Sequence, residues 1–439
     1  MTQTVVVGGG LSGLVAGLAL ARRGETVRVL EASPRAGGAV RTESADGFLL
    51  ELGPNTVRPT AEIWGLVSEL GLADSALFAP ARLPRFIDFD GHLHALVPGP
   101  GTLVTTRLLS ARGKLRLLRE PFVARGSDPE ESVSAFFARR LGREVAERLV
   151  APFISGIWAG DAGELSVAAA FPALAAWERE HGSLLRGALA SRRRSRASRP
   201  PPRGLFSFRD GLETLPRAIA GRLGASLSLG TAVTGLTRTP AGWRVQTAAG
   251  PVDANRVVIA TSAPAAAKLL EPVDPDAARA LGEILHPPLA VIHLTYPASA
   301  FTQPLSGFGH LVVPAPGRRV LGAVWSSCLF PGRAPEGRLL LTAFAGGARD
   351  PDVVGLPDVK LLEIASRELA RSLGASGPPR LLRVTRHARA IPQYTPGHIA
   401  RLETLAETER RLPGLHFLGN YRGGISVGDV VRNALAPLS

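Results

Sequence analysis

Short apolar runs separated by helical patterns mark both ends of the chain. Residues 4–7 (Thr-Val-Val-Val) and 26–30 (Thr-Val-Arg-Val-Leu) are typical of strands buried in a parallel sheet. A helical pattern occupies residues 14–23 between them. Similar buried runs recur at 257–261 and 415–418, so we expect one sheet to collect strands from distant parts of the chain.

The middle of the chain follows two other patterns. From Leu103 to Arg148, apolar residues recur at helical spacing among basic ones, which predicts amphipathic helices. From about 286 to 386, alternating segments indicate a larger, mostly antiparallel sheet. Residues 191–203 are rich in arginine, serine and proline and lack an apolar anchor, so a mobile basic loop is expected there.

A glycine-rich turn joins the first strand to its helix. Gly8 permits a tight turn, Gly10 lets the backbone approach a pyrophosphate, and Gly13 lets the helix pack closely on the strand. The free N–H groups at the start of the helix favour an anion. Glu31 ends the second strand, where it can accept hydrogen bonds from ribose hydroxyls. A plain glycine turn would not explain this acid, so the unit predicts a Rossmann-like dinucleotide site.

The net charge of the chain limits the kinds of partner that we expect. The formal net charge is +14, and only three of the 51 basic residues are lysine. Such a surface attracts anions. No nucleic-acid motif is visible and the aromatic residues do not alternate with the basic runs, so we expect a membrane surface or an anionic substrate, and no nucleic acid.

Composition also excludes several kinds of site. The single cysteine, Cys328, excludes an internal disulfide, an iron–sulfur cluster and a cysteine-rich zinc site. The histidines are scattered without ligand spacing, so no metal is expected. No secretory signal opens the sequence, and no apolar run reaches the roughly 18–20 residues that span a bilayer. We therefore expect a cytoplasmic protein, peripheral on the inner face of the cell membrane.

The residues after Glu31 distinguish flavin from nicotinamide. The segment 31–42 (Glu-Ala-Ser-Pro-Arg-Ala-Gly-Gly-Ala-Val-Arg-Thr) resembles the signature of the amine-oxidase-like flavoproteins. Two departures matter: Ala39 stands where amine oxidases often carry arginine, and residues 421–424 lack the cysteine of enzymes with covalent flavin. The resemblance therefore implies FAD that is bound noncovalently.

Later segments resemble the protoporphyrinogen oxidase family in particular. They are the run 156–172, Arg85-Phe86 before the Asp90-Gly91 turn, 307–311 with 321–322 and 330–331, and 391–398 with 419–421. The resemblance implies an FAD-dependent six-electron oxidation of protoporphyrinogen IX to protoporphyrin IX in haem biosynthesis. Oxygen or another acceptor would reoxidise the flavin.

The resemblance also implies the site residues. For the cofactor they are Gly8, Gly10, Leu11, Ser12, Gly13, Glu31, Ala32, Arg35, Gly37, Gly38, Gly53, Pro54, Asn55, Val233, Gly419, Asn420, Ile425, Ser426 and Val427. For the substrate they are Arg85, Gly156, Phe308, Leu311, Phe344 and Asn55. Arg85 would hold a propionate in a bidentate pair, and the apolar residues would flank the macrocycle. No acid or base is assigned, because the sequence contains no compelling triad or carboxylate dyad.

The expected fold is α/β plus α+β. A Rossmann-like FAD-binding domain would form from residues 1–84, 204–285 and 387–439. A mainly helical, membrane-facing domain that admits the substrate (85–190) would be inserted, followed by the basic loop (191–203). A mixed-sheet substrate-binding domain would span 286–386. A homodimer stays open.

Other substrates and functions also stay open. Coproporphyrinogen III carries four propionates and would need more cations than Arg85, so protoporphyrinogen is favoured. Another FAD amine oxidase, a carotenoid desaturase, and a basic membrane adaptor without activity are the remaining alternatives.

Overall fold

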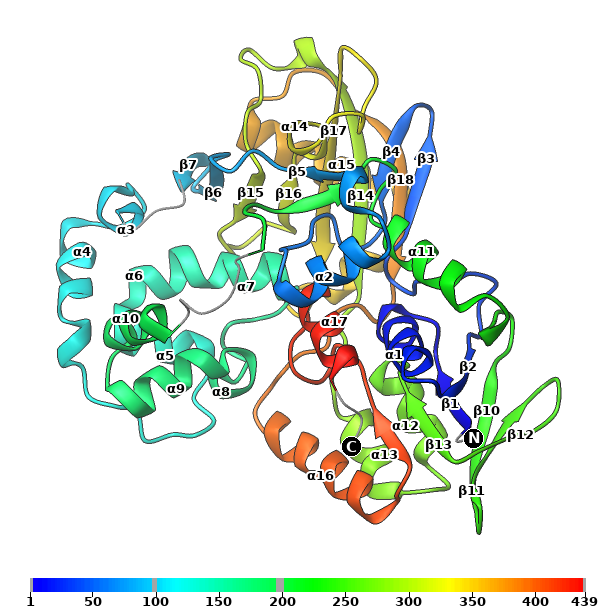
Figure 1. The fold of residues 1–439 in the computed structure, drawn as a ribbon. Coiled ribbons are helices and arrows are strands. Elements are labelled where there is room, and N and C mark those ends of the chain that lie inside the picture. Colours follow the sequence, from blue (N-terminus) through cyan, green and yellow to red (C-terminus); the bar gives the residue numbers. More distant parts are fainter. Residues whose placement is uncertain (1–2, 97–100, 195–200, 437–439) are drawn as a thin grey trace.

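The computed structural model describes residues 3–96, 101–194 and 201–436. Three parts are visible in Figure 1: a block of helices on the left, a large sheet at the top, and a smaller sheet with its helices at the lower right. The fold is therefore mixed α/β, with one parallel and one mixed sheet, as the sequence predicts.

The parallel sheet has five strands in the order β19-β13-β1-β2-β9. All four pairings between neighbours are parallel. The strands are β1 (Gln3–Val7), β2 (Thr26–Leu30), β9 (Leu227–Ser228), β13 (Arg256–Ile259) and β19 (Leu415–Phe417). The expectation that distant segments share one sheet is confirmed.

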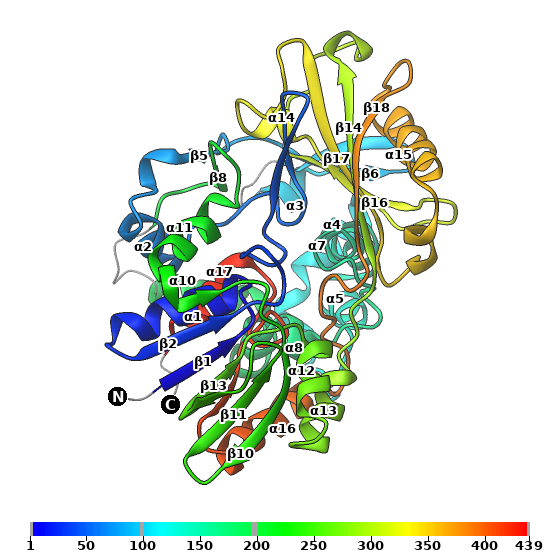
Figure 2. The ribbon, with the colours of Figure 1, turned by 90° about the vertical axis from the view of Figure 1, so that its right-hand side faces the viewer.

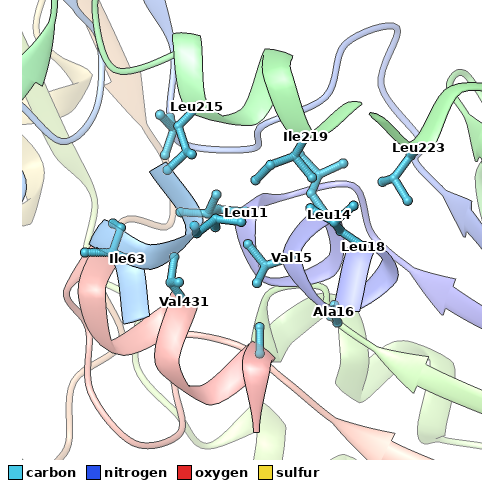
Figure 3. Close-up of a cluster of buried hydrophobic side chains, with 14 of the residues drawn as sticks. Leu11, Leu14, Val15, Ala16, Leu18, Ile63, Leu215, Ile219, Leu223 and Val431 are labelled. Carbon is cyan, nitrogen blue, oxygen red and sulfur yellow. The ribbon is translucent and has the colours of Figure 1, made fainter. Parts of the chain in front are cut away.

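Alternation along β1 divides the apolar residues between the two faces of this sheet. Val6 belongs to a core with helices on one face, and the close-up in Figure 3 shows their side chains interlocking. Those helices are α1 (Leu11–Arg22), α2 (Ala61–Glu69), α11 (Thr214–Leu223) and α17 (Val427–Leu435). Val5 and Val7 belong to the core on the opposite face.

A small antiparallel sheet and three helices cover that opposite face, below β1 and β13 in Figure 2. The helices are α12 (Ala263–Leu270), α13 (Pro275–Gly282) and α16 (His398–Arg411). The strands are β10 (Val233–Thr239), β11 (Gly242–Thr247) and β12 (Val252–Ala254). The parallel strands are thus buried on both faces, which explains their uniform apolarity.

The larger sheet has seven strands in the order β18-β14-β17-β16-β15-β6-β7. They are β6 (Arg85–Phe89), β7 (His92–Leu96), β14 (Leu289–Pro297), β15 (Gly309–Val312), β16 (Val320–Val324), β17 (Arg338–Gly346) and β18 (Arg380–His387). Only the β15–β6 pair is parallel, and α15 (Asp358–Leu373) packs on one face. Residues 85–96, which the expected boundary placed in the helical segment, pair with this sheet because β6 hydrogen-bonds to β15.

Short elements connect these parts. The hairpin β3 (Thr42–Ala45) and β4 (Phe48–Glu51) and the pair β5 (Ala76–Phe78) and β8 (Phe206–Phe208) form two-stranded sheets. The remaining short helices are η1 (Ala73–Ser75), η5 (Gly224–Ser226), η6 (Ala298–Ala300), α14 (Ser326–Leu329) and η7 (Pro351–Gly355).

The helical block begins after β7. It contains α3 (Thr102–Thr105), α4 (Ala111–Leu118), η2 (Glu120–Phe122), α5 (Val133–Leu141), α6 (Arg143–Val145), η3 (Ala146–Val150), α7 (Ala151–Trp158), α8 (Val167–Ala170), α9 (Pro172–His181) and α10 (Leu184–Arg194). The expected basic loop starts later than predicted, because α10 continues to Arg194. Residues 195–200 of that loop lie outside the described residues. Within the described residues, no helix is long and apolar enough to cross a membrane.

A buried ion pair joins the two ends of this block. Arg140 on α5 is fully buried and pairs with Glu120 of η2. Glu120 also accepts hydrogen bonds from the Ser183 hydroxyl (2.6 Å) and the Leu184 N–H (2.8 Å), at the start of α10. Burial alone would raise the pKa of Glu120, but these hydrogen bonds hold it below its ordinary value. The pair therefore fastens α10 to α5, and both carboxylate oxygens of Glu120 have hydrogen-bond partners.

Candidate active site

A cavity of about 750 Å³ opens where the parallel strands end. The turn after β1 and the start of α1 form one wall, and the segments after β13 and β19 form another. Carboxyl ends of parallel strands meet at one edge of a sheet, and ligands of such folds bind there. The cavity is therefore the candidate cofactor site.

The turn between β1 and α1 has the shape that a pyrophosphate needs. Gly10 is the N-cap of α1, and a Cβ added to it would meet nothing nearer than Gly38 Cα, at 4.0 Å. Leu11 and Ser12 open the helix and line the cavity, so unpaired N–H groups of the first turn lie at its wall. The space beside Gly10 is open to a ligand rather than filled by the protein.

Gly13 has a different task. A Cβ at this position would lie 1.9 Å from the Gly8 carbonyl oxygen, inside the backbone of the turn itself. Gly13 does not line the cavity. Its absence of a side chain lets α1 lie against the turn, as the sequence predicts for the third glycine of the motif.

Glu31 lies at the end of β2 and lines the cavity. One carboxylate oxygen accepts a hydrogen bond from the Gly9 N–H (2.6 Å), and the other accepts from the Ser33 N–H (2.8 Å). A Cβ on Gly9 would lie 2.7 Å from Glu31 Cβ. Glu31 therefore braces the turn, a role in addition to the predicted contact with ribose.

The paired glycines line the cavity, whereas the arginine before them supports their loop. Gly37 and Gly38 both form part of the wall, at φ angles of 106° and 58° that favour glycine. Arg35 is not among the lining residues, and its guanidinium donates to the carbonyls of Ala36 (3.1 Å) and Gly38. Burial, and then the charge of Arg41, lower the pKa of Arg35.

The C-terminal wall depends on a tyrosine whose role the sequence left unassigned. The Tyr394 hydroxyl donates to the Asn420 carbonyl (2.6 Å) and accepts from the Gly424 N–H (3.1 Å). Its ring stacks on His398 with centroids 4.0 Å apart. Tyr394 thereby ties together the two ends of the turn that leads from β19 toward α17. A hydroxyl that spans two backbone groups leaves no trace in a sequence pattern.

Most of the predicted cofactor residues line this one cavity. They are Gly8, Gly10, Leu11, Ser12, Glu31, Ala32, Gly37, Gly38, Pro54, Val233, Gly419, Asn420, Ile425 and Val427. Five others are absent from its wall: Gly13, Arg35, Gly53, Asn55 and Ser426. Gly53 packs against the Ala39 carbonyl oxygen, where a Cβ would lie at 2.0 Å, and Ser426 forms the capping box of α17 with Asp429. These two shape the wall through the backbone.

Three titratable residues of the wall went unpredicted: Lys268, His286 and Arg389. Lys268 and Arg389 bring positive charge to a cavity that the start of α1 already makes favourable for anions. Burial is the main cause that lowers the pKa of His286. They belong to no motif. They reach the cavity only because α12, the segment before β14 and the segment after β18 fold against the sheet.

The predicted substrate residues form two groups on the larger sheet. The Arg85 guanidinium carbon lies 5.1 Å from the centroid of the Phe308 ring, and both residues line a second cavity of about 250 Å³. Leu311 and Phe344 form the other group, because each pairs with Gly322 from opposite sides. Residues paired in register point to the same face of a sheet, so Leu311 and Phe344 lie on one face. Gly322 between them carries no side chain.

Gly156 joins the second group. A Cβ on Gly156 would lie 2.2 Å from Leu311 Cδ2, so α7 packs on the sheet at this point. Asn55 lies elsewhere, beside a small buried pocket with Glu51 and Arg333, and its amide donates to the Gly53 carbonyl (3.1 Å). Burial raises the pKa of Glu51, and Arg333 opposes that effect.

The sequence of the whole chain is similar to known flavoproteins. The model of the flavin containing amine oxidoreductase family matches residues 11–436. Protoporphyrinogen oxidase 1 of Arabidopsis thaliana chloroplasts is 36% identical, over 99% of this chain and 86% of its own. Human protoporphyrinogen oxidase is 35% identical, over 99% of this chain and 97% of its own. The chain belongs to the protoporphyrinogen oxidases of this flavoprotein family.

Solved structures agree with this family. A structure from Exiguobacterium sp. 255-15, assigned to protoporphyrinogen oxidase, superposes with a TM-score of 0.81 at 25% identity, over 99% of this chain and 97% of that one. Putrescine oxidase bound to putrescine superposes with a TM-score of 0.70 at 17% identity, over 99% and 97%, and shares the fold alone. The cavity fits the flavin of this family, because Gly10 leaves the cradle open and α1 points its N-terminus into it.

The two glycines of the protoporphyrinogen oxidase turn should respond differently to substitution. Gly10→Val should fold normally, because a Cβ there meets no atom nearer than 4.0 Å and the φ of −68° suits valine. It should lose most of its flavin, at least about tenfold, because the side chain occupies the pyrophosphate position. Gly13→Val should instead lower the melting temperature. Flavin absorbance per protein and circular dichroism melts measure both effects.

Gly221→Ala on α11 is the matched control, because nothing lies within 4 Å of its added Cβ. It should leave flavin content unchanged and should not lower the melting temperature, because alanine favours a helix more than glycine does. Full flavin content in Gly10→Val would contradict the assignment of the cradle.

Proposed function

We propose that this protein uses FAD to oxidise protoporphyrinogen IX to protoporphyrin IX in haem biosynthesis. The full-length similarity to protoporphyrinogen oxidases carries this proposal. Six electrons and six protons leave the substrate in three two-electron steps, and oxygen or another acceptor takes the electrons. The product is aromatic, so the reaction has a large driving force and needs little acid–base machinery.

The protein's share of this reaction is binding and orientation. FAD, when bound, supplies the electron-accepting chemistry. The start of α1 and the Gly37-Gly38 loop would hold its phosphates, and Glu31 its ribose. Arg389, Lys268 and the 419–427 segment, held by Tyr394, would complete the enclosure.

The substrate would lie along the larger sheet. Leu311 and Phe344 offer apolar walls for a flat macrocycle, with α7 close behind Leu311 at Gly156. Arg85 would pair with a propionate. We propose the same division of labour for the chain as a whole: the parallel-sheet part holds FAD, and the seven-stranded sheet and the helical block hold the substrate.

Coproporphyrinogen III is the second candidate substrate. It carries two further propionates, whose burial without cations would be costly. The apolar character of Leu311 and Phe344 favours protoporphyrinogen, which has vinyl groups at those two positions of the macrocycle.

We propose that FAD is bound noncovalently. Cys328 is the single thiol of the chain, and it is absent from the cavity wall. Its Sγ donates to the Leu305 carbonyl (3.3 Å), and burial raises its pKa to about 11. A thiol held in this way is a poor nucleophile.

We also propose that the helical block binds a membrane surface. Leu118 on α4 is 71% exposed and Phe122 on η2 is 83% exposed, and α10, which contacts η2, adds exposed leucines at 185 and 189. The arginine-rich segment from 192 to 203 begins at the end of α10 and continues past it in the sequence. Apolar side chains flanked by basic ones suit an anionic lipid surface.

Acid precipitation checks the noncovalent cofactor. Purified protein should be yellow, and acid should release all of its flavin into the supernatant, where chromatography identifies FAD. Flavin that remains in the protein pellet would refute noncovalent binding while leaving the family unchanged.

Aerobic turnover with two porphyrinogens tests the substrate. Protoporphyrinogen IX should be oxidised with higher kcat/KM than coproporphyrinogen III. The fluorescence of the porphyrin product measures both rates. Arg85→Ala should raise KM about tenfold with little change in kcat, because a propionate contact persists from ground state to transition state. Higher efficiency with coproporphyrinogen III would overturn the substrate assignment, and no turnover of either would overturn the function.

Vesicle flotation tests the membrane surface. Leu118→Ser with Phe122→Ser should reduce binding to anionic vesicles several-fold, because apolar burial in lipid is lost. Val359→Ser on α15 is the control, since Val359 is 65% exposed on a different part of the molecule. Rising salt should also weaken binding, because exposed charges are screened within about 10 Å at 0.1 M. Equal loss in the control would argue against this surface.

A further inference from the structure

The second cavity, of about 250 Å³, lies where β6 begins. Its wall contains Arg58 from the segment after β4, Arg85 from β6, Phe308 before β15, and small or apolar residues from 79–83 and 202–205. The drug-sized ligands that fill typical pockets need roughly 300–1,000 Å³. This cavity therefore suits one edge of a large ligand, not a whole macrocycle.

The charge of this cavity is uncompensated. Its wall holds two arginines and no carboxylate. Among the described residues, neither Arg58 nor Arg85 forms an ion pair, and no carboxylate acts on the pKa of Arg85. The chain also has no acidic residue between Glu180 and Asp210, next to the wall residues 202–205. Burial, and then the charge of Arg58, lower the pKa of Arg85. The two arginines thus line one cavity, where their like charges repel each other.

Two arginines beside another cavity have acidic partners. Beside the 520 Å³ cavity next to the helical block, Arg349 pairs with Asp161 (3.1 Å) and Arg318 pairs with Asp88 (2.8 Å). Two like charges held together without a counter-ion cost free energy that an anionic ligand would recover. Arg58 and Arg85 differ from these two arginines, because their cavity wall offers no carboxylate to pair with.

We infer that Arg58 and Arg85 together form a subsite for two carboxylates of the substrate, so that Arg58 is a second residue that determines specificity. The inference rests on the proposed function and deepens it. Protoporphyrinogen carries its two propionates on neighbouring pyrrole rings, at one edge of the macrocycle. A guanidinium for each carboxylate matches that edge, because planar fork geometry suits bidentate pairing.

The arrangement also explains how Phe308 contributes. Arg85 lies over its ring at 5.1 Å, which holds the guanidinium against an apolar surface, and Arg85 as a whole remains exposed to a ligand. Arg58 has no such support among the described residues. We therefore expect Arg85 to be the better positioned of the two, and Arg58 to add a contact whose strength falls with salt.

Binding of the product porphyrin to the flavin-loaded enzyme tests the subsite without turnover. Affinities for protoporphyrin IX and for its dimethyl ester should be measured by fluorescence in the wild type, Arg58→Gln, Arg85→Gln and the double variant. Each single substitution should weaken binding of the diacid about tenfold and leave the ester unaffected, because the ester carries no charge. Arg58→Lys should recover part of the loss, since it restores charge without the fork.

Arg82→Gln is the matched control, because Arg82 is exposed nearby but absent from the wall. In turnover, Arg58→Gln should raise KM with kcat and melting temperature unchanged. Diacid binding that falls no further in Arg58→Gln than in Arg82→Gln would overturn the inference, as would an equal loss for the ester. An Arg58→Gln variant with the KM and kcat of the wild type contradicts this inference alone. A wild type that does not turn over porphyrinogens contradicts the proposed function.

Discussion

The close approach of α1 to the parallel sheet is the constraint on which the candidate site depends. A Cβ on Gly13 would lie 1.9 Å from the Gly8 carbonyl oxygen, and one on Gly17 would lie 2.6 Å from Val29 Cγ2. Because both positions lack side chains, α1 packs on β1 and β2 at backbone distance. Its first N–H groups therefore reach the edge where the strands end, and Gly10 leaves the adjoining space open.

A second constraint places Arg85 relative to that edge. β6 is joined to the larger sheet by its parallel pairing with β15, and by Arg318, which bridges Asp88 on β6 and Glu368 on α15. Burial alone would raise the pKa of Asp88, but hydrogen bonds from Arg318 and Ser372 hold it below its ordinary value. Because these contacts tie β6 to both β15 and α15, β6 has little freedom to move. Arg85 at its start is then held at the rim of the smaller cavity.

Pairing with carboxylates also determines where positive charge remains on the molecule. Many of the arginines pair with carboxylates, as Arg140 does with Glu120 and Arg422 with Glu409. Those pairs are structural, and they cancel charge locally. The net charge of +14 is therefore informative only where pairing fails, and Arg58 with Arg85 is such a place. A high net charge by itself predicted attraction to anions without a location.

The sequence by itself determined the parallel-strand unit, its glycine turn and Glu31, because these depend on residues that are neighbours along the chain. It also predicted that strands near 257 and 415 join the same sheet, since runs apolar on both faces must be buried on both faces. The resemblance to the family was visible in the sequence, because its motifs place particular residue types at fixed spacings. Residue by residue, the glycines and apolar positions of the candidate cofactor wall were the most predictable part.

Only the tertiary structure decided the rest, because it depends on contacts between segments far apart in the sequence. β6 and β7 joined the larger sheet, contrary to the expected boundary, because pairing with β15 outweighed the helical pattern that follows them. Arg35 proved to support its loop, and Tyr394 proved to hold the 420–424 turn, because hydrogen bonds to backbone carbonyls leave no periodic signal. Arg58 meets Arg85 across 27 positions of sequence, and only folding brings the two charges to one cavity.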